Sequence, residues 1–367
     1  MPNSTTMPGS LSDLTPEWLT EALRASTSLG AGRVTSVDST LIGDGNGLMS
    51  QVARLRLSYD APGPGAPEVL IVKLPPEDAG SRSVGVQLGF FEREARFYED
   101  LARHTAIRAP RCYFTRYEPA GGRFLTLLED LSGARPGDIG AGCGLDDGMA
   151  AMRALAGLHA SWWESAVLAS LPWLQTRGGR LAVMLSMLDE AWPTFVSRFS
   201  DGLEEWELRA LASVHGLLSR SPNLLSGGPP TLLHGDYKLD NMLFADDGDV
   251  VAFDWGLVMT GPAAFDVAYF LGLDFEPPER RRDEGDLIRS YVDALAANGV
   301  KGYAFDTCVA DYHVQLAGLL PQLIVAGGRA TFADEEAMQR YATGLRRVLA
   351  AVSDHCVLEK LQTDGSG

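Results

Sequence analysis

The spacing of hydrophobic and polar positions changes about one third of the way along the chain. Between Ala53 and Tyr59 apolar residues alternate with polar ones, the period of two expected of a half-buried strand. Residues 34–42 and the apolar run "VLIVKLPP" (69–76) predict two more strands, so 34–75 is expected to form three antiparallel strands. The stretch "RCYFTRYEPAGGRFLTLLEDL" (111–131) predicts a hairpin that turns at Ala120-Gly121-Gly122.

Helical spacing dominates the rest of the chain. "LTPEWLTEALRAS" (14–26) predicts a short helix, and "VQLGFFEREARFYEDLARH" (86–104) predicts one helix inside the β-rich part. Further helices are expected over 145–165, 178–198, 203–219, 284–298, 305–325 and 333–356. These patterns predict an α+β fold. Residues 1–131 would form a β-rich lobe with one main helix, beginning with a helical extension over 1–30, and residues 132–367 a mostly helical lobe.

Composition narrows the range of partners. The formal net charge of −17 argues against nucleic acid and against an anionic membrane, because both need a basic surface. It favours a cationic substrate only weakly, since acidic surfaces commonly serve solubility. Four widely spaced cysteines without a CxxC pair argue against zinc or an iron–sulfur cluster. The start "MPNSTTMPGS" lacks the features of a signal peptide, and no apolar run approaches the ~20 residues of a membrane span, so a cytoplasmic protein is expected.

A glycine-rich segment joins the first two predicted strands. "GDGNG" contains Gly43, Gly45 and Gly47, and Ser50 follows three residues later. Glycine lets backbone N–H groups converge on an anion, and a loop between antiparallel strands suits a flap over phosphates. The segment is not a Walker A motif, which needs Gly-Lys-Ser/Thr, nor a Rossmann motif, which needs a following helix. Considered alone, it is equally well explained as a glycine-rich hairpin turn.

A lysine interrupts the apolar strand at 69–76. Lys73 has apolar neighbours on both sides, and a buried ammonium is costly unless it reaches a partner. It is either an edge lysine whose amine reaches solvent or a cation for nucleotide phosphates, held by a helix carboxylate. Glu92 and Glu94 lie on different faces of the following helix, so at most one should face the strand. We favour Glu94, which lies alongside the apolar face between Phe91 and Tyr98.

The densest group of polar residues lies in "LLHGDYKLDNMLF" (232–244), between apolar flanks. Its His234, Asp236 and Asn241 match the kinase catalytic loop H-R-D-x-x-x-x-N. Phosphoryl transfer needs these residue types, because a carboxylate accepts the hydroxyl proton and aims the oxygen, while an amide oxygen holds Mg²⁺ without adding charge. Lys238 could neutralise charge on the transferred phosphoryl group. The role of Asp240 stays open.

A further acid follows thirteen residues after Asn241. Asp254 lies in "AFDWG", where kinases have the aspartate of D-F-G, and a carboxylate there would coordinate Mg²⁺ between nucleotide phosphates. Alone, it could be an acid that caps backbone groups beside a strand. The glycine loop, Lys73, Asp236, Asn241 and Asp254 occur in this order between a β-rich and a helical lobe. Together they predict a kinase-type site.

These motifs resemble those of the aminoglycoside phosphotransferase and choline-kinase-like superfamily, which has a protein-kinase-like fold, and most of all its bacterial ecdysteroid-kinase-like members. "LLHGDYKLDNMLF" is similar to the motif H-G-D-x-x-x-x-N, and "FDWGLVMTGPAAFDVAYFL" to the D-W segment with a downstream D-x-A-Y. "FLTLLEDL" resembles the hinge between the lobes, and "LAGLHASWW" the helix after it. The resemblance covers roughly residues 34–350.

The resemblance implies a role for each matching residue. Asp236 would be the catalytic base or the acid that orients the substrate. Asn241 and Asp254 would bind Mg²⁺. Lys73 would contact the α- and β-phosphates of ATP and pair with Glu94.

Other positions would support the nucleotide and the loop. Residues 43–50 would cover the phosphates, and the backbone of Glu129 and Leu131 would meet adenine. His234 and Asp266 would brace the catalytic loop, although Asp266 taken alone would also suit a helix N-cap.

With this resemblance, the sequence predicts an ATP- and Mg²⁺-dependent kinase that phosphorylates a hydroxyl of a small molecule. The acceptor would be an aminoglycoside, an amino sugar, a nucleoside antibiotic or a similar metabolite, in resistance, biosynthesis or metabolism. Gly235 replaces the arginine of protein kinases, and only eleven residues separate Asp254 from Asp266, which disfavours a protein kinase with an activation segment. A catalytically silent, kinase-shaped nucleotide-binding protein is the other alternative. Retention of the charged and metal-binding set argues against it, and the oligomeric state is open.

Overall fold

The computed structural model describes residues 7–24, 26, 29, 32–42, 50–220 and 224–364. Contacts divide the chain into two compact units. The first comprises Met1–Arg103 and Ala109–Gly133, and the second comprises His104–Arg108 and Ala134–Gly367. Each unit has its own core, and each is described separately below.

The segment 104–108 belongs to the second unit, although the sequence suggested a single boundary after residue 131. Arg108 forms a parallel bridge with Val251, and the N–H of Ala106 donates to Oγ of Ser161 at 2.9 Å. Such a return of five residues leaves no trace in hydrophobic spacing, because it depends on pairing with a segment far along the chain.

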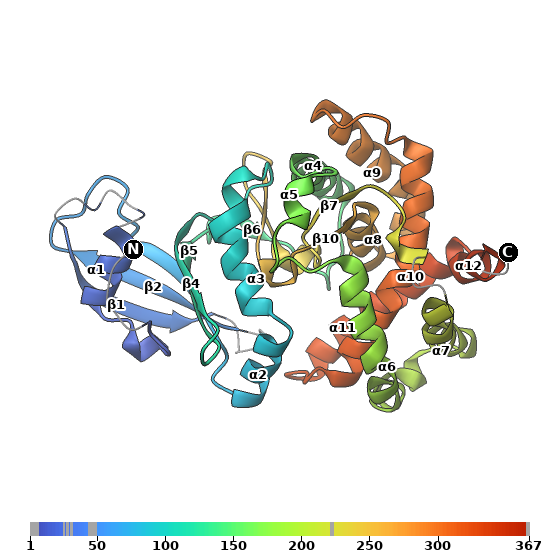
Figure 1. Ribbon diagram of the computed structural model, residues 1–367, viewed down its shortest axis with the longest axis horizontal. Helices are drawn as coiled ribbons and strands as arrows, with labels where there is room; N and C mark the ends of the chain where they lie inside the picture. The colour runs from blue at the N-terminus through green and yellow to red at the C-terminus, as the bar shows by residue number, and fades with distance from the viewer. Residues whose placement is uncertain are drawn as a thin grey trace. The chain divides into compact units, whose positions relative to one another are not determined.

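The first unit is built on a five-stranded antiparallel sheet with the strand order β1-β2-β3-β5-β4 (Figure 1). The strands are β1 (Val34–Leu41), β2 (Gln51–Tyr59), β3 (Val69–Leu74), β4 (Cys112–Glu118) and β5 (Arg123–Glu129). The three predicted strands and the predicted hairpin are therefore present. The hairpin turns at Gly121 and Gly122, whose φ angles of 88° and 60° glycine adopts without strain.

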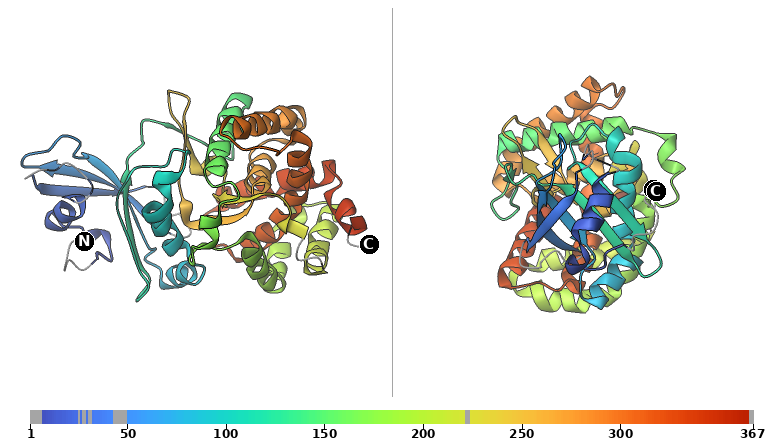
Figure 2. Two further views of the ribbon diagram at one scale, coloured as in Figure 1. Left: turned by 45° about the horizontal axis from the view of Figure 1, so that its top comes forward. Right: turned by 90° about the vertical axis from the view of Figure 1, so that its left-hand side faces the viewer.

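Side chains of β3 alternate between the two faces of this sheet. Leu70, Val72 and Leu74 are fully buried and share a hydrophobic core with α1 (Pro16–Arg24), which packs on the sheet (Figures 1 and 2). Lys73 falls between them in sequence and so faces the opposite side of the sheet. The period of two thus builds the core and also directs the one lysine of this strand away from it.

The single helix predicted over 86–104 is wrong in its extent. The chain forms α2 (Ala79–Gln87), breaks, and continues as α3 (Phe90–Arg96), a π-helical turn at Phe97–Leu101 and a 3-10 turn at Ala102–His104. The break lies at Gly89, whose φ of 70° is left-handed and cannot continue an α-helix. Asp78 caps the start of α2 by accepting the N–H of Ser81 at 2.6 Å.

The second unit is mostly helical. Its long helices are α4 (Leu145–Ser161), α6 (Arg177–Phe199), α7 (Glu205–Arg220), α9 (Pro277–Ala297), α10 (Phe305–Arg329) and α11 (Glu335–Asp354), and shorter ones are α5 (Ala166–Ala169) and α12 (Val357–Asp364). Every long helix overlaps a predicted one, although α9 begins earlier, at Pro277, whose fixed φ suits a first helical position. Among the described helices, none combines the length and apolarity that crossing a membrane requires.

The prediction misses the short helices α5 and α12 and one longer, buried helix. In α8 (Ala264–Leu273) every residue is buried, so no polar face marks a helical period. α8 packs against α9, α10 and α11, among which it lies in Figure 1. Its position inside the unit lets its side chains reach the loops that surround it.

Short strands hold the polar stretch 232–244. β7 (Pro230–Leu233) pairs antiparallel with β10 (Met259–Pro262). β8 (Met242–Phe244) pairs antiparallel with β9 (Val250–Ala252) and with β6 (Arg135–Pro136). The loop 234–241 therefore leaves one small sheet and enters another, so both of its ends are fixed.

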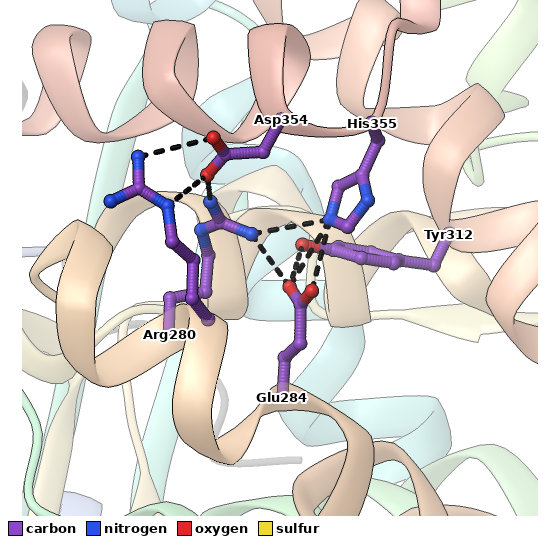
Figure 3. A network of polar contacts seen from close by, with 6 residues as sticks. Arg280, Glu284, Tyr312, Asp354 and His355 are labelled. Atoms are coloured by element: carbon purple, nitrogen blue, oxygen red, sulfur yellow. Dashed lines mark hydrogen bonds and ion pairs between the residues drawn. The ribbon is translucent and has the colours of Figure 1, made fainter.

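A network of charged side chains ties α9 to the end of α11 (Figure 3). Arg280 is fully buried, and the two terminal nitrogens of its guanidinium contact Glu284, Asp354 and His355. The phenol of Tyr312 donates to Glu284 at 3.2 Å. The anionic partners offset the cost of burying this cation.

Candidate active site

Lys73 and Glu94 form a buried ion pair within the first unit. Nζ of Lys73 lies 2.7 Å from Oε1 of Glu94, and only 7% and 4% of the two residues are exposed. β3 supplies the lysine and α3 supplies the glutamate. A cation fixed in this way is suited to a phosphate group, because the carboxylate holds it in position.

The remaining nucleotide contacts expected of this unit are described only in part. Three loop glycines lie outside the described residues: Gly43, Gly45 and Gly47. Ser50 is described, and lies half-buried directly before β2. The N–H of Glu129 donates to the carbonyl of Arg111 at 2.8 Å, so it is not available to a base. Within the described part of the chain the peptide groups of Leu131 make no hydrogen bond, which leaves them able to bind a polar edge.

In the second unit, the stretch 234–241 begins with a turn that requires glycine. Gly235 has a φ of 80°, and a Cβ there would lie 2.2 Å from the carbonyl oxygen of Leu257. Leu257 belongs to the 3-10 turn directly after Asp254. The close approach therefore packs the two motif-bearing segments against each other, which gives the glycine of this motif a steric cause.

Asp266 anchors this turn through its carboxylate. Oδ2 accepts the N–H of His234 at 2.7 Å, and Oδ1 accepts the N–H of Gly235 at 3.0 Å. The imidazole of His159 lies 3.3 Å from the same Oδ2. The N-cap of α8 is Ala263, so Asp266 does not cap the helix and instead satisfies backbone groups of the loop.

His234 is packed rather than exposed. Its ring lies 4.4 Å from the ring of Trp255, centroid to centroid, and Nε2 lies 3.1 Å from the carbonyl oxygen of Phe253. Burial holds the pKa of His234 below its ordinary value, against the attraction of nearby carboxylates. A neutral imidazole that donates through Nε2 joins the loop to the segment that carries Asp254.

The carboxylate of Asp236 receives hydrogen bonds on both oxygens. Oδ1 accepts the phenol of Tyr269 at 2.6 Å. Oδ2 accepts the side-chain amide of Asn241 at 2.8 Å and lies 3.1 Å from Nζ of Lys238. The amide nitrogen of Asn241 also donates to the backbone carbonyl of Asp236 at 2.8 Å, so it makes two hydrogen bonds to the same residue. The amide oxygen of Asn241 has no partner among the described residues.

The charge of Asp236 follows from these contacts. Burial alone would raise the pKa of Asp236, but Lys238 and the hydrogen bond from Tyr269 outweigh it and hold this pKa below its ordinary value. Burial also opposes the charge of Lys238, yet the carboxylate of Asp236 raises the pKa of the amine. Asp236 is therefore a carboxylate at neutral pH, able to accept a hydrogen bond from a hydroxyl and aim its oxygen.

Asn241 and Asp254 lie on segments joined by a hydrogen bond, from the N–H of Phe253 to the carbonyl of Asn241 at 3.0 Å. Asp254 is exposed and has a φ of 66°, a left-handed conformation that costs a non-glycine residue about 1–2 kcal/mol. An amide oxygen and a carboxylate are the hard ligands that suit Mg²⁺. The described residues contain no cluster of three or more His, Cys, Asp or Glu side chains able to hold a metal. Asn241 and Asp254 supply ligand atoms of the kind that a divalent ion of this type takes.

Comparison with protein families matches residues 44–301 to the ecdysteroid kinase-like family. The chain belongs to the ecdysteroid kinase-like family. Membership confirms the resemblance found in the sequence and the enzyme class predicted from it, a phosphotransferase that acts on an alcohol group. A comparison with curated proteins finds no match.

Solved structures of similar fold include three kinases. Choline kinase from Cryptosporidium parvum Iowa II has 11% identity and a TM-score of 0.58, over 88% of this chain and 91% of that chain. A mutant of aminoglycoside 2'-phosphotransferase-IIIa in complex with GDP has 13% identity and a TM-score of 0.52, over 86% and 91%. Amicoumacin kinase has 14% identity and a TM-score of 0.51, over 84% and 87%. These likenesses confirm the predicted protein-kinase-like α+β fold.

The sequence motifs did not predict the role of one side chain in this kinase-like site. Tyr269 lies in the D-x-A-Y segment, but its bond to Asp236 spans 33 positions and cannot be derived from spacing. Tyr269 follows Asp266 by three residues on α8, so the two lie on one helix face. One face of a buried helix thus anchors the turn through Asp266 and bonds the carboxylate through Tyr269. That spacing was the available signal.

The sequence predicted no role for Asp240, and the structure shows that its carboxylate connects three segments of the second unit. Its Oδ1 accepts the N–H of Ile139 at 2.9 Å and a guanidinium N–H of Arg340 at 2.9 Å. It joins the loop to the segment after β6 and to α11.

Proposed function

We propose that this chain uses Mg²⁺ and ATP to phosphorylate a hydroxyl of a small molecule. The observation that carries the proposal is the carboxylate of Asp236. This carboxylate is buried and ionised, and both of its oxygens accept hydrogen bonds. It lies beside the amine of Lys238 and the side-chain amide of Asn241. Lysine and asparagine beside a carboxylate are the residue types that phosphoryl transfer uses, and such a carboxylate can aim an acceptor hydroxyl.

In the proposed reaction the acceptor hydroxyl donates a hydrogen bond to Asp236. A bond forms between the acceptor oxygen and the γ-phosphorus, and the bond from that phosphorus to the leaving oxygen of ADP breaks. The hydroxyl proton passes to Asp236 and then to solvent. The low pKa of Asp236 makes it a weak base, which suits the late proton transfer of a loose transition state.

Nucleotide and metal would be held by the residues already named. Asn241 through its amide oxygen and Asp254 through its carboxylate would bind the ion, and the chemistry expected of a divalent ion there is neutralisation of phosphate charge. Lys73, held by Glu94, would bind the α- and β-phosphates, with residues 43–50 over them. Lys238 would offset charge on the transferred group.

The base of the nucleotide would meet the end of β5. Leu131 offers free peptide groups, and Glu129 would contribute through its carbonyl, because its N–H is already donated.

The named functions of the similar structures support a small-molecule acceptor. One is a choline kinase, one an aminoglycoside phosphotransferase with GDP, and one an amicoumacin kinase with AMP-PNP and Ca²⁺. The short path from Asp254 through β10 into α8 leaves no room for an activation segment of the protein-kinase kind. Aminoglycosides, amino sugars and nucleoside antibiotics are all candidate acceptors.

A screen for ADP release tests the proposal. The chain is incubated with Mg·ATP and a library of hydroxyl-bearing metabolites and antibiotics, and products are checked by mass spectrometry for one added phosphoryl group. Asp236→Ala should lower turnover by roughly 10²–10⁴-fold and leave the Kd for Mg·ATP nearly unchanged. Asp246→Ala, at an exposed acid outside the site, is the matched control. Wild-type turnover in Asp236→Ala would refute the assigned role, and Mg·ATP binding without transfer to any compound would favour a silent binding protein.

A further inference from the structure

Among the residues that the structure describes, the side chain of the buried Arg180 has no hydrogen-bond or ion-pair partner. It lies in the first turn of α6 with 7% of its surface exposed. Its guanidinium makes no hydrogen bond or ion pair with any residue that the structure describes, and its Nε is fully enclosed. Burying a cation without a partner is costly, so such a residue calls for a reason.

The other buried arginines of the described chain show what a structural role looks like. Arg93 donates to the carbonyl of Leu88, and Arg177, one turn before Arg180, donates to the carbonyl of Gly318 at 2.8 Å. Two more bond to carboxylates: Arg280 (Figure 3) and Arg347. Each of these four is tied to another segment of the fold, whereas the side chain of Arg180 is tied to none that the structure describes.

The neighbours of Arg180 place it at the candidate active site. Tyr269 and the carboxylate of Asp236 both lie near enough to Arg180 to act on it electrostatically, against the effect of burial on its charge. Tyr269 bonds Oδ1 of Asp236, whereas Asn241 and Lys238 contact Oδ2. The two oxygens thus face different partners. Asn241, the proposed metal ligand, lies on the Oδ2 side. Tyr269 lies on the Oδ1 side, with Arg180 near it.

We propose that Arg180 binds an anionic group of the acceptor substrate, a carboxylate, a phosphate or a sulfate, beside the hydroxyl that Asp236 aims. This rests on the proposed function and names the acceptor class of the same site. A guanidinium fork matches planar or tetrahedral anionic oxygens with two N–H donors. Lys238 is already paired with Asp236, whereas Arg180 has no carboxylate in direct contact among the residues that the structure describes. The local charge therefore favours an acidic acceptor, although the net charge of the whole chain is −17.

The same guanidinium could in principle meet the transferred phosphoryl group, so the test fills the nucleotide site first. The chain saturated with Mg·AMP-PNP is titrated with sodium sulfate at constant ionic strength, by calorimetry. Four proteins are compared: wild type, Arg180→Gln, Arg180→Lys and Arg329→Gln. Arg329 forms an exposed ion pair with Glu190 and is the matched control for loss of one positive charge.

Sulfate should bind the wild type and Arg329→Gln alike. Arg180→Gln should weaken it by roughly tenfold or more, as expected for a lost hydrogen bond to a charged group. Arg180→Lys, which keeps the charge and loses the fork, should lie between them. Equal binding by Arg180→Gln would overturn the proposal. So would no binding to the wild type, or sulfate binding that AMP-PNP abolishes, because Arg180 would then serve no acceptor or serve the donor.

Kinetics with matched acceptors provide a second readout. Phosphorylation of D-glycerate against glycerol, and of D-glucuronate against D-glucose, compares acidic with neutral compounds, and glucosamine and kanamycin represent amines. Arg180→Gln should raise KM for an acidic acceptor by roughly tenfold or more and leave KM for ATP within about twofold. If only the amines are phosphorylated, and if wild type and Arg180→Gln phosphorylate them equally well, the proposed acidic acceptor is refuted. The chain would still be a kinase. Failure of Mg·AMP-PNP binding would instead refute the proposed function.

Discussion

The phenol of Tyr269 donates a 2.6 Å hydrogen bond to Oδ1 of Asp236. Tyr269 itself receives a hydrogen bond from Nε2 of Gln322 at 3.0 Å, which leaves its own proton for the carboxylate. A donor that stabilises the carboxylate lowers the pKa of Asp236 and weakens it as a base. The pair therefore favours an Asp236 that orients an acceptor over one that removes a proton early.

Tyr269→Phe should reduce activity and shift its pH dependence. The substitution keeps the ring and removes one hydrogen bond to a charged group, so kcat should fall by roughly ten- to a hundredfold. It also raises the pKa of Asp236. Because the reaction uses the carboxylate, activity is lost as the pH falls through that pKa, so the acidic limb of kcat/KM should move to higher pH. A pH profile of kcat/KM for both proteins measures the shift.

Tyr303→Phe is the matched control, since Tyr303 donates to Asp311 at 2.9 Å on another part of the unit. It removes a tyrosine–aspartate bond of the same kind and should leave the acidic limb in place. An unmoved limb in Tyr269→Phe would show that its phenol does not tune Asp236.

Gly235→Ala should disrupt the catalytic turn. The substitution introduces strain at a φ of 80° and a Cβ 2.2 Å from the carbonyl oxygen of Leu257, so we expect a loss of unfolding free energy of ~3 kcal/mol or more. Gly299→Ala has a similar φ of 94° with nothing within 4 Å of the new Cβ, and should lose only ~1 kcal/mol. Urea unfolding of both variants isolates the clash. Equal losses would mean that the loop moves aside at no cost.

Much of this site could be predicted from the sequence, because phosphoryl transfer restricts the residue types that can occur at fixed spacings. Asp236 and Asn241 lie five positions apart on one loop, so local geometry places them together. The period of two along the strand sets which face of the sheet Lys73 occupies. The helix that follows in the chain contains few acids that could pair with it. These inferences need only short stretches of chain.

The rest depends on packing between distant segments. Tyr269 reaches Asp236 from α8, 33 positions along the chain, and no local pattern predicts that contact. α8 has no polar face, so its period is invisible in the sequence. The break at Gly89 was missed because apolar spacing continues on both sides of it.

Lys73→Met should separate the structural role of the lysine from its proposed role in phosphate binding. Loss of the cation leaves the buried Glu94 carboxylate without its ion pair, which should lower the unfolding free energy by ~3 kcal/mol and raise KM for ATP at least about tenfold. Adding Glu94→Gln to this variant removes the buried charge. Stability should then recover in part, while KM for ATP stays high. Recovery of both would mean that Lys73 acts only through the fold.

Asp274→Asn should stabilise the protein increasingly as the pH rises. Asp274 is fully buried, its Oδ1 accepts the N–H of Leu239 at 3.2 Å, and its Oδ2 has no partner. Burial raises the pKa of Asp274 well above its ordinary value. The folded state then keeps a proton that the unfolded chain releases, so this residue reduces stability as the pH rises above its ordinary pKa. Asparagine removes this loss, so the gain in unfolding free energy should grow by about 1.4 kcal/mol per pH unit, until the pH reaches the pKa of Asp274 in the folded state.

Urea unfolding at pH 5 and at pH 8 measures the effect, and the gain should be larger at pH 8. Asp283→Asn is a control of opposite sign, because hydrogen bonds from Arg282 lower the pKa of Asp283 despite its partial desolvation. Asp283 stays ionised in both states over this range, so its loss of stability should be the same at the two pH values. A gain in Asp274→Asn that does not change with pH would show that Asp274 is ionised in the folded protein. Its carboxylate would then add a further buried negative charge beside the loop that carries Lys238.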